Sequence, residues 1–417
     1  TLSLNEEEED LFECDEEPHM CQLYSYGYMP VNLGQMIIDT LERKLEVVRK
    51  LGFGQSSSVW LAQVYRYVIK FICLGLYPTK YIAVKVLTAN TSYMLGHGFL
   101  AELKALRKIM FANPGHPGFQ HCPHLYDYFL YRKERNYHVC LVTEVQGRSL
   151  SVLASNRPNC SFSLPQTKQI IKQVLLALDY LYRECKFVHT DKHLPLIFVP
   201  GRDTIVERYL DEQPAAYYSQ SIPEVLSTPI ICPKSQPLPG FSSGQNAEHF
   251  SISLIDYNSA ASSTERLFDY IQTLSYQAPE VMLGFPWSTP IDIWSVGCLV
   301  SHCLVGVCPF DTSHSKQYGM SNEDIHLQGV LQNIGPFSKE FLEQCTRQTD
   351  YFANDGALLR AGLFKFPLFK TLLQAYGTIQ ETDTIAAASF MCKCITINPD
   401  KRPTTLELLE EEWLDGV

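Results

Sequence analysis

The feature that most constrains the fold of this chain is a change of hydrophobic pattern along its 417 residues. From about Arg43 onward, short runs rich in β-branched residues read as strands: LEVVRKLGFG, SSSVWLAQV and KYIAVKVL, with a glycine turn between the first two. After about residue 100 helical spacing takes over, most clearly over 165–183, where Ser163 and Gln166 precede the helix at capping-box spacing. This order predicts an α+β chain with a small β-rich part first and a larger helical part second.

Composition restricts the class of protein further. Hydrophobic residues make up 46% of the chain and charged residues 19%, enough for a sizeable core, which excludes wholesale disorder. With 34 Lys+Arg against 45 Asp+Glu the net charge is −11, which argues against a phosphate-neutralising nucleic-acid surface and suits a basic partner, although an ordinary acidic protein fits too. The 14 scattered cysteines indicate reduced, buried thiols, and no zinc-type ligand set accompanies Cys392 and Cys394.

Four segments depart from the main pattern. Residues 1–20 are dense in carboxylates and are expected to form a disordered acidic tail. Residues 199–250 are rich in Pro, Ser and Gly and predict a long surface loop or insertion. The apolar stretch 66–79 fits a local insertion or an error in the predicted sequence. Residues 293–310 carry no formal charge and favour a buried core helix over a membrane span.

The first chemical signal is a pair of glycines, Gly52 and Gly54, between two strand-like runs. Such a loop can bring backbone N–H groups close to phosphates, but most strand–glycine–strand patterns are plain hairpins. The strand–loop–strand setting disfavours a dinucleotide fold. Lys85 ends a buried-looking strand, and Glu102 on the next helix is its natural partner, because a buried lysine needs a counter-charge. A lysine–glutamate pair that faces phosphates is the arrangement that protein kinases use.

Further motifs follow in a fixed order. The sequence HTD occupies 189–191, LIDYNSA occupies 254–260, APE occupies 278–280, DIWSVG occupies 292–297 and NPDKRP occupies 398–403. With these the chain resembles a eukaryotic protein kinase from about residue 44 to 414. It is more narrowly similar to the SR-protein kinase family in its fungal-type branch. That likeness rests on YGYMPVNLG at 26–34, SSSVWLA at 56–62 and IQT at 271–273, together with HTD.

The resemblance implies a bilobal protein-kinase-like fold that uses ATP and Mg²⁺. The β-rich N-lobe with its N-terminal extension would span 21–145, and the mainly helical C-lobe would span 146–417 and carry the insertion at about 199–250. The residues implied to hold the nucleotide are Gly52, Gly54, Val59, Ala83, Lys85, Glu102, Glu144 and Val145. Among them Ala83 would lie beside the adenine, Glu144 and Val145 would form the hinge, and Lys85 would hold the α- and β-phosphates.

The same resemblance assigns roles in the C-lobe. Asp191 would accept the proton of the substrate hydroxyl and Asp256 would bind magnesium. The residues implied to have structural roles are Glu280 and Arg402, as an ion pair, and Asp292, as a brace for the catalytic loop. Thr190 replaces an arginine that receives activation-loop phosphate in many kinases, so we expect any activity to be independent of such phosphorylation.

The catalytic loop also departs from the family pattern. His193 occupies the place of a lysine, where it could still donate to the γ-phosphate, and Leu196 occupies the place of an asparagine. Leucine offers no oxygen to a cation, so the second magnesium site is damaged. The magnesium tripeptide reads Asp-Tyr-Asn over 256–258, and Asn258 tolerates a positive φ better than other non-glycine residues. Three readings stay open: a kinase working at reduced rate, a pseudokinase that binds protein and perhaps ATP, and a faulty gene model.

The resemblance further implies a substrate, namely serines in Arg/Ser-rich splicing proteins. Glu323 and Asp324, in SNEDI, match the family's docking insert and would attract an arginine-rich chain, although a solvated acidic loop without a partner fits the residues as well. We expect a monomer that contacts neither membrane nor nucleic acid and resides in cytoplasm and nucleus.

Overall fold

The computed structural model describes residues 16, 27–39, 44–65, 79–133, 136–190, 196–198, 203–218, 233–238, 250–262, 271–312, 320–363, 365–376 and 379–417. The predicted acidic tail, apart from Glu16, and residues 66–78 of the apolar stretch therefore lie outside the described residues. The chain divides into two compact units. The first unit comprises 1–103, 124–148 and 199–242, and the second comprises 104–123, 149–198 and 243–417.

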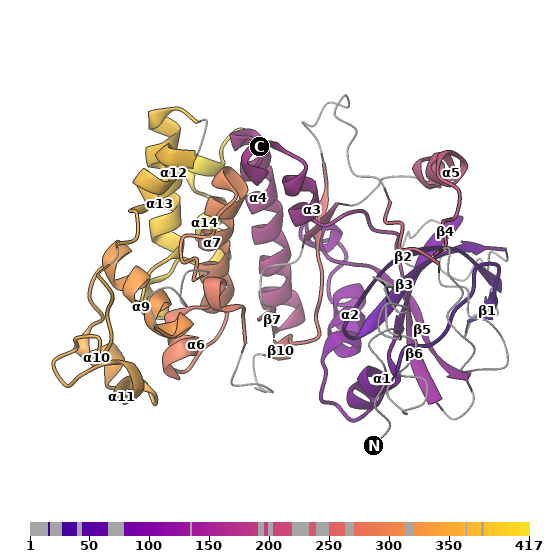
Figure 1. Cartoon of the computed structure of the whole chain (residues 1–417), viewed down its shortest axis with the longest axis horizontal. Coiled ribbons are helices and arrows are strands. Elements are labelled where there is room, and N and C mark those ends of the chain that lie inside the picture. Colours follow the sequence, from indigo (N-terminus) through magenta and orange to yellow (C-terminus); the bar gives the residue numbers. More distant parts are fainter. Residues whose placement is uncertain are drawn as a thin grey trace, which may run out of the picture. The chain divides into compact units, whose positions relative to one another are not determined.

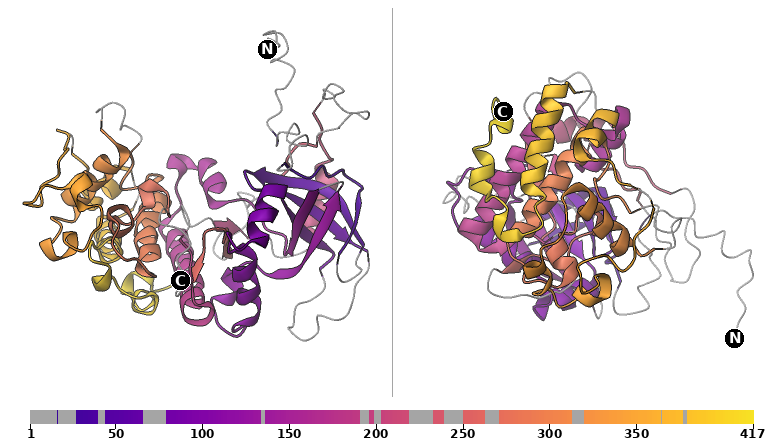
Figure 2. Two further views of the ribbon diagram at one scale, coloured as in Figure 1. Left: turned by 90° about the horizontal axis from the view of Figure 1, so that it is seen from below. Right: turned by 90° about the vertical axis from the view of Figure 1, so that its left-hand side faces the viewer.

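The first unit is built on a six-stranded antiparallel sheet in the order β1-β2-β3-β4-β6-β5 (Figure 1). The strands are β1 Met36–Ile38, β2 Lys44–Gly54, β3 Ser57–Val64, β4 Tyr81–Leu87, β5 Leu125–Lys133 and β6 Asn136–Thr143. Because side chains of a strand alternate between faces, Trp60 and Ala62 enter one core with Val47 and Val84, whereas Leu61 points to the other face. Figure 2 shows these strands lying side by side.

The second face of the sheet is covered by the inserted segment, which we define as residues 203–218 and 233–238. The sequence predicts a surface loop here, but the segment contains helix α5, Asp203–Glu212. Val206 and Tyr209, one helical turn apart, pack with Leu61 and Tyr81 of the sheet. Of the two alternatives that the sequence left open, a loop or an insertion, the loop is therefore wrong for residues 203–212, because a single short amphipathic helix is hard to recognise among Pro- and Ser-rich neighbours.

Two further helices accompany the sheet. Helix α1, Ala89–Gly96, begins at Thr88, whose side chain accepts a hydrogen bond from the backbone N–H of Thr91. Helix α2, Glu102–Phe111, follows, and the division between the units falls after Leu103 within it. Glu102 thus belongs to the first unit, together with β4.

The second unit is mainly helical, and its centre is formed by α4, Leu164–Tyr180, and α7, Pro290–Val305 (Figure 1). Helix α4 begins with the predicted capping box of Ser163 and Gln166. Helix α13, Glu381–Cys394, packs on α7, with α12, Phe369–Tyr376, beside both. All but two of the 16 residues of α7 are buried, so the uncharged stretch is a core helix, as predicted. Within the described residues no helix is long and apolar enough to cross a membrane.

Shorter elements complete this unit. The remaining helices are α3 Leu150–Ser155, α6 Pro279–Leu283, α9 Asn322–Asn333, α10 Lys339–Leu342, α11 Gln348–Tyr351 and α14 Thr405–Leu409. Two small ribbons pair β7, Phe187–Val188, with β10, Ala261–Ser262, and β8, Leu196–Phe198, with β9, Ile252–Leu254. These ribbons flank the predicted catalytic and magnesium motifs, so they fix the backbone on which the motifs lie.

Candidate active site

The glycine pair lies at the tip of a β-hairpin in the first unit. Gly52 pairs with Val59 and Gly54 with Ser57, and Gln55 and Ser56 make the turn. Neither glycine has a positive φ, and among the described residues other than its chain neighbours none has an atom within 4 Å of the place where a Cβ would stand. Neither backbone conformation nor packing therefore demands glycine here, whereas close approach of a ligand to the backbone would. The Tyr28 hydroxyl donates to the Gly54 carbonyl over 2.6 Å and steadies the tip.

Lys85 lies on β4 opposite Val59 of this hairpin and forms an ion pair with Glu102. Glu102 is 4% exposed and stands in the first turn of α2, where the helix dipole favours a carboxylate. The Lys85 side chain keeps 22% of its surface exposed. One carboxylate oxygen of Glu102 has no hydrogen-bond partner among the described residues. The predicted pair therefore exists, and the lysine side chain is only partly buried.

The other residues assigned to the nucleotide lie on the strands around this pair or directly after β6. Ala83 is buried on β4 and lies opposite Thr143 of β6, directly before the predicted hinge. Glu144 accepts a hydrogen bond from the backbone N–H of His124 over 3.2 Å, and its carboxylate lies 3.4 Å from the His124 ring. Burial raises the pKa of Glu144, against the opposing effect of His124. Val145 packs toward the inserted segment.

In the second unit, the segment before Asp191 is held by Asp292, the third residue of α7. Its carboxylate accepts hydrogen bonds from the backbone N–H groups of His189 at 2.8 Å and Thr190 at 3.0 Å. The Tyr182 hydroxyl donates to the same carboxylate over 3.0 Å. Burial raises the pKa of Asp292 to about 6, although these three donors favour its charged form. The predicted bracing contact is therefore present.

Two residues of the motifs adopt left-handed backbone conformations, Thr190 with φ 60° and Asp256 with φ 70°. A positive φ is costly for a β-branched residue and persists only where the surroundings enforce it. Thr190 is enforced on three sides: its N–H binds Asp292, its hydroxyl donates to the Ser259 carbonyl, and its own carbonyl accepts from Gln272 N–H at 3.2 Å. The expected tolerance of Asn258 is not used, because the left-handed residue of the tripeptide is Asp256.

The hydrogen bonds around Asp256 also determine where the His189 ring carries its proton. The Asp256 carboxylate accepts a hydrogen bond from the Asn258 side-chain amide at 2.8 Å. His189 donates from Nε2 to the Ile255 carbonyl over 3.0 Å, and burial lowers its pKa to about 4 despite the nearby Asp256 charge. The His189 ring is therefore neutral at physiological pH with its proton on Nε2. This leaves the Asp256 carboxylate as the negative group of the motif.

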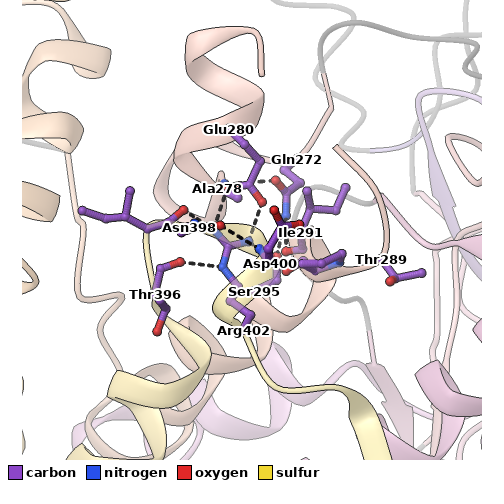
Figure 3. Close-up of polar contacts among 12 residues, drawn as sticks. Gln272, Ala278, Glu280, Thr289, Ile291, Ser295, Thr396, Asn398, Asp400 and Arg402 are labelled. Carbon is purple, nitrogen blue, oxygen red and sulfur yellow. Dashed lines mark hydrogen bonds and ion pairs between the residues drawn. The ribbon is translucent and has the colours of Figure 1, made fainter. Parts of the chain in front are cut away.

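Figure 3 shows the buried polar centre of this unit, built around Glu280 and Arg402. Both side chains are fully buried, and Arg402 Nη2 lies 2.7 Å from Glu280 Oε2. Arg402 also donates to the carbonyls of Pro290 at 3.0 Å and Thr396 at 2.6 Å. The expected ion pair is thus present, and its spare N–H groups are satisfied by backbone oxygens, as a buried charge pair requires.

Gln272 also belongs to this centre, and no role was assigned to it from the sequence. Its φ is 64°, and its side-chain amide donates to Ser295 at 2.8 Å and to the Ile291 carbonyl at 2.9 Å (Figure 3). Its amide oxygen accepts from the N–H of Ala278 at 3.0 Å. Gln272 therefore ties the segment that follows Asp256 to α7 and α6. Its place in the IQT motif was the feature of the sequence that could have indicated this structural role.

Comparison with known proteins agrees with this geometry. Residues 243–414 match the family model of the protein kinase domain. The chain carries a protein kinase domain. Relatives extend the match to most of the remaining residues, since serine/threonine-protein kinase SRPK of Physarum polycephalum is 26% identical over 94% of this chain and 89% of its own length. Protein kinase dsk1 of Schizosaccharomyces pombe is 26% identical over 94% of this chain and 84% of its own length.

SRSF protein kinase 3 of Mus musculus is 22% identical over 93% of this chain and 89% of its own length. The crystal structure of the kinase domain of PF14_0431 shares the fold, with a TM-score of 0.64, 21% identity, and coverage of 93% of this chain and 99% of that one. These findings confirm the predicted kinase fold, with a β-sheet N-lobe and a helical C-lobe. They make the chain a serine/threonine protein kinase with homologues in the SR-protein kinase family.

Of the two residues predicted to dock the substrate, Glu323 and Asp324, only Glu323 is accessible. Helix α9 begins after Ser321, whose hydroxyl caps it by accepting from the Asp324 N–H. Asp324 is 1% exposed, and its carboxylate binds Arg360 at 2.7 Å and the Ser321 hydroxyl at 2.8 Å. The expectation that Asp324 faces a substrate is therefore wrong, because its charge is already paired inside the unit. Glu323 keeps a partly exposed side chain.

Three predicted positions of the kinase remain to be placed. Asp191 and His193 lie outside the described residues. The backbone at Leu196 forms the start of β8, opposite Leu254 of β9. Asp256 follows two residues after Leu254, so the position that lacks the family's asparagine is anchored next to the magnesium motif.

Proposed function

We propose that this kinase transfers the γ-phosphate of ATP to serine residues in Arg/Ser-rich proteins. The observation that carries the proposal is the Lys85–Glu102 pair beside the open glycine hairpin of the first unit. A half-buried lysine on a sheet, paired with a carboxylate, suits the α- and β-phosphates of a nucleotide.

The residues present fit ATP and at least one metal ion. The hairpin at Gly52 and Gly54 leaves open space where side chains would otherwise stand, and Lys85 supplies positive charge nearby. Asp256 offers a carboxylate from a left-handed backbone position. Bound Mg²⁺ would neutralise charge on the β- and γ-phosphates, and Asp256 is the side chain that would hold it. Leu196 cannot add a second protein ligand.

The second unit supplies the base. In the proposed reaction the serine oxygen bonds to the γ-phosphorus, the bond from that phosphorus to the bridging oxygen breaks, and ADP leaves. The serine proton passes to the carboxylate of Asp191. Asp292 and the neutral ring of His189 hold the backbone directly before this residue. Because Thr190 is locked by its own contacts, we propose that the reaction needs no activation-loop phosphate.

A second candidate is a pseudokinase that binds nucleotide or protein without transfer. It is favoured by Leu196 in place of asparagine and by the Asp-Tyr-Asn tripeptide, because a lost metal ligand removes several kcal/mol of transition-state stabilisation, or orders of magnitude in rate. Single-turnover transfer from labelled ATP to an Arg-Ser repeat peptide separates the candidates. Incorporation that Asp191→Ala abolishes supports the kinase. Thermal stabilisation by Mg-ATP without any incorporation supports the pseudokinase.

The Arg/Ser-rich substrate is a finer proposal, supported by the relatives and by the net charge of −11. Glu323 is the acidic residue left to attract arginines, since Asp324 is buried. We expect Glu323→Ala to weaken binding of an Arg-Ser peptide about threefold at low salt, which fits one exposed charge contact. Glu343→Ala, which removes an exposed carboxylate paired with Lys339, is the control. Equal peptide affinity of the Glu323→Ala and Glu343→Ala variants in a titration would contradict the docking role.

A further inference from the structure

One residue of the acidic N-terminal run, Glu16, is described by the structure, and it contacts the first unit. Glu16 belongs to the carboxylate-rich stretch 5–17, yet it is only 8% exposed. Its carboxylate lies 2.6 Å from Lys50 Nζ. It also accepts hydrogen bonds from Ser235, from the backbone N–H at 2.5 Å and from the hydroxyl at 2.6 Å. We call these three residues, Glu16, Lys50 and Ser235, the Glu16 clip.

Lys50 connects the clip to the glycine hairpin. It lies on β2 two residues before Gly52 and is 1% exposed. Its ammonium group lies 5.2 Å from the ring centre of Phe53 and 5.7 Å from that of Trp60, both within cation–π range. Phe53 stands between the two glycines and is 41% exposed. The ammonium group therefore links Glu16 to the tip side chain of the hairpin.

Ser235 connects the clip to the inserted segment. The next residue, Gln236, donates its N–H to the Lys50 carbonyl over 2.9 Å, and its side-chain oxygen accepts from Arg49 at 2.9 Å. The Gln236 carbonyl accepts from the Tyr209 hydroxyl at 2.7 Å. Three stretches far apart in sequence thus meet on β2 immediately before the hairpin, and Glu16 bonds to two of them.

Buried charged groups are stable when they are paired and hydrogen-bonded. Without the Glu16 carboxylate, Lys50 loses the ion pair at 2.6 Å and Ser235 loses both of its hydrogen bonds to Glu16. This loss loosens the contact of Lys50 with Phe53 and the strand that leads to Gly52. Building on the proposed nucleotide-binding function, we propose that Glu16 is a positioning residue for ATP. It orders the glycine hairpin through Lys50 and couples the acidic N-terminal run to nucleotide affinity.

The test compares Glu16→Gln, Glu16→Asp and the unchanged full chain. The control is Glu212→Gln, which removes an exposed carboxylate at the end of α5. Hydrogen exchange of residues 44–65 and 233–238 reports the clip without any nucleotide. Titration with trinitrophenyl-ATP and Mg²⁺ reports affinity without requiring catalysis. We expect Glu16→Gln to speed exchange in both segments and to raise the Kd of the analogue about fivefold, a loss of about 1 kcal/mol of binding free energy. Glu16→Asp, which keeps the charge, should restore part of both.

Several outcomes would overturn the proposal. Exchange in Glu16→Gln equal to that of the unchanged chain would show that Glu16 does not order the hairpin. Faster exchange with unchanged Kd would show a structural contact without positioning. If the unchanged chain fails to bind the analogue, the proposed function fails, while exchange still decides whether Glu16 orders the hairpin. If Glu16→Gln does not fold, Ser235→Ala keeps the ion pair, removes one hydrogen bond and should give the same changes at smaller size.

Discussion

At the scale of single residues, burial decides the protonation of His326. This residue lies on α9 and is fully buried, with its ring 4.9 Å from that of Phe310. Burial lowers the pKa of His326 to about 3. The unfolded chain takes up a proton on this ring below about pH 6.5, whereas the folded chain does not. The free energy of unfolding therefore falls as the pH drops from 6.5 toward 3.

His326→Phe should remove this contribution. We expect the loss of unfolding free energy between pH 7.5 and pH 5 to shrink by about 2 kcal/mol, since 1.5 pH units correspond to about 2 kcal/mol. Urea denaturation at the two pH values measures the change. His97→Gln, at an exposed histidine, is the control. An equal loss in the chain with and without His326 would contradict the assignment.

The ion pair of Glu280 and Arg402 gives a second residue-scale prediction. Arg402→Ala leaves a fully buried carboxylate without its partner, so we expect the unfolding free energy to fall by about 3–5 kcal/mol. Lys339→Ala, at an exposed pair 3.7 Å from Glu343, should cost less than about 1 kcal/mol. Denaturant titration of both variants makes the comparison, and similar losses would show that burial of the pair is unimportant.

Residue pairs were predictable where the motif order named both partners. Lys85 with Glu102 and Glu280 with Arg402 were both expected and both exist. Asp324 was misjudged because a carboxylate in the first turn of a helix looks the same in sequence whether it faces solvent or an arginine 36 residues away. The partner, Arg360, carries no local signal.

At the scale of elements, helix α4 depends on a close approach by Gly118. A Cβ at Gly118 would stand 1.9 Å from the Leu176 carbonyl oxygen and 2.9 Å from Tyr180 Cβ, both on α4. Since that helix forms the centre of the second unit, Gly118→Ala should lower the unfolding free energy by about 1–3 kcal/mol or more. Gly115→Ala, where the nearest atom is Asn113 Oδ1 at 3.5 Å, is the matched control. Thermal melts that fall equally for both variants would contradict this contact.

Elements with strong periodicity or caps were predicted well. Helix α4 and its capping box were expected from Ser163 and Gln166, and the three strands around the glycine turn match the β-like runs. Helix α5 was missed because its two buried side chains find their partners on strands more than 100 residues earlier. The apolar face of α5 is buried only when the folded sheet is present to pack against it.

At the scale of the whole molecule, the inserted segment completes the first unit. Tyr209 is 2% exposed in the core with Leu61 and Tyr81. We expect Tyr209→Ala to cost about 3–5 kcal/mol, as for other buried aromatic residues. Hydrogen exchange should rise in β3 and β4 but not in α13 of the second unit. Tyr217→Ala, at a side chain that is 45% exposed, is the control, and faster exchange in α13 would contradict the division into units.

The molecule as a whole was predictable to the level of its fold and its protein kinase class. Motif order placed the sheet, the helical part and the kinase signature correctly, because each motif is tied to one kind of backbone. The assignment of the inserted segment to the first unit was not predictable, because its hydrophobic pattern does not indicate which surface it covers.

The position of this segment has a consequence for biosynthesis. The ribosome delivers the sheet by residue 143, but the residues that cover its second face emerge only with 203–238, after α4. Until then the nascent chain exposes Leu61 and Tyr81 to solvent as an unshielded apolar surface. Such a surface attracts chaperones or neighbouring chains. A chain truncated between residue 143 and residue 203 should therefore be prone to aggregation.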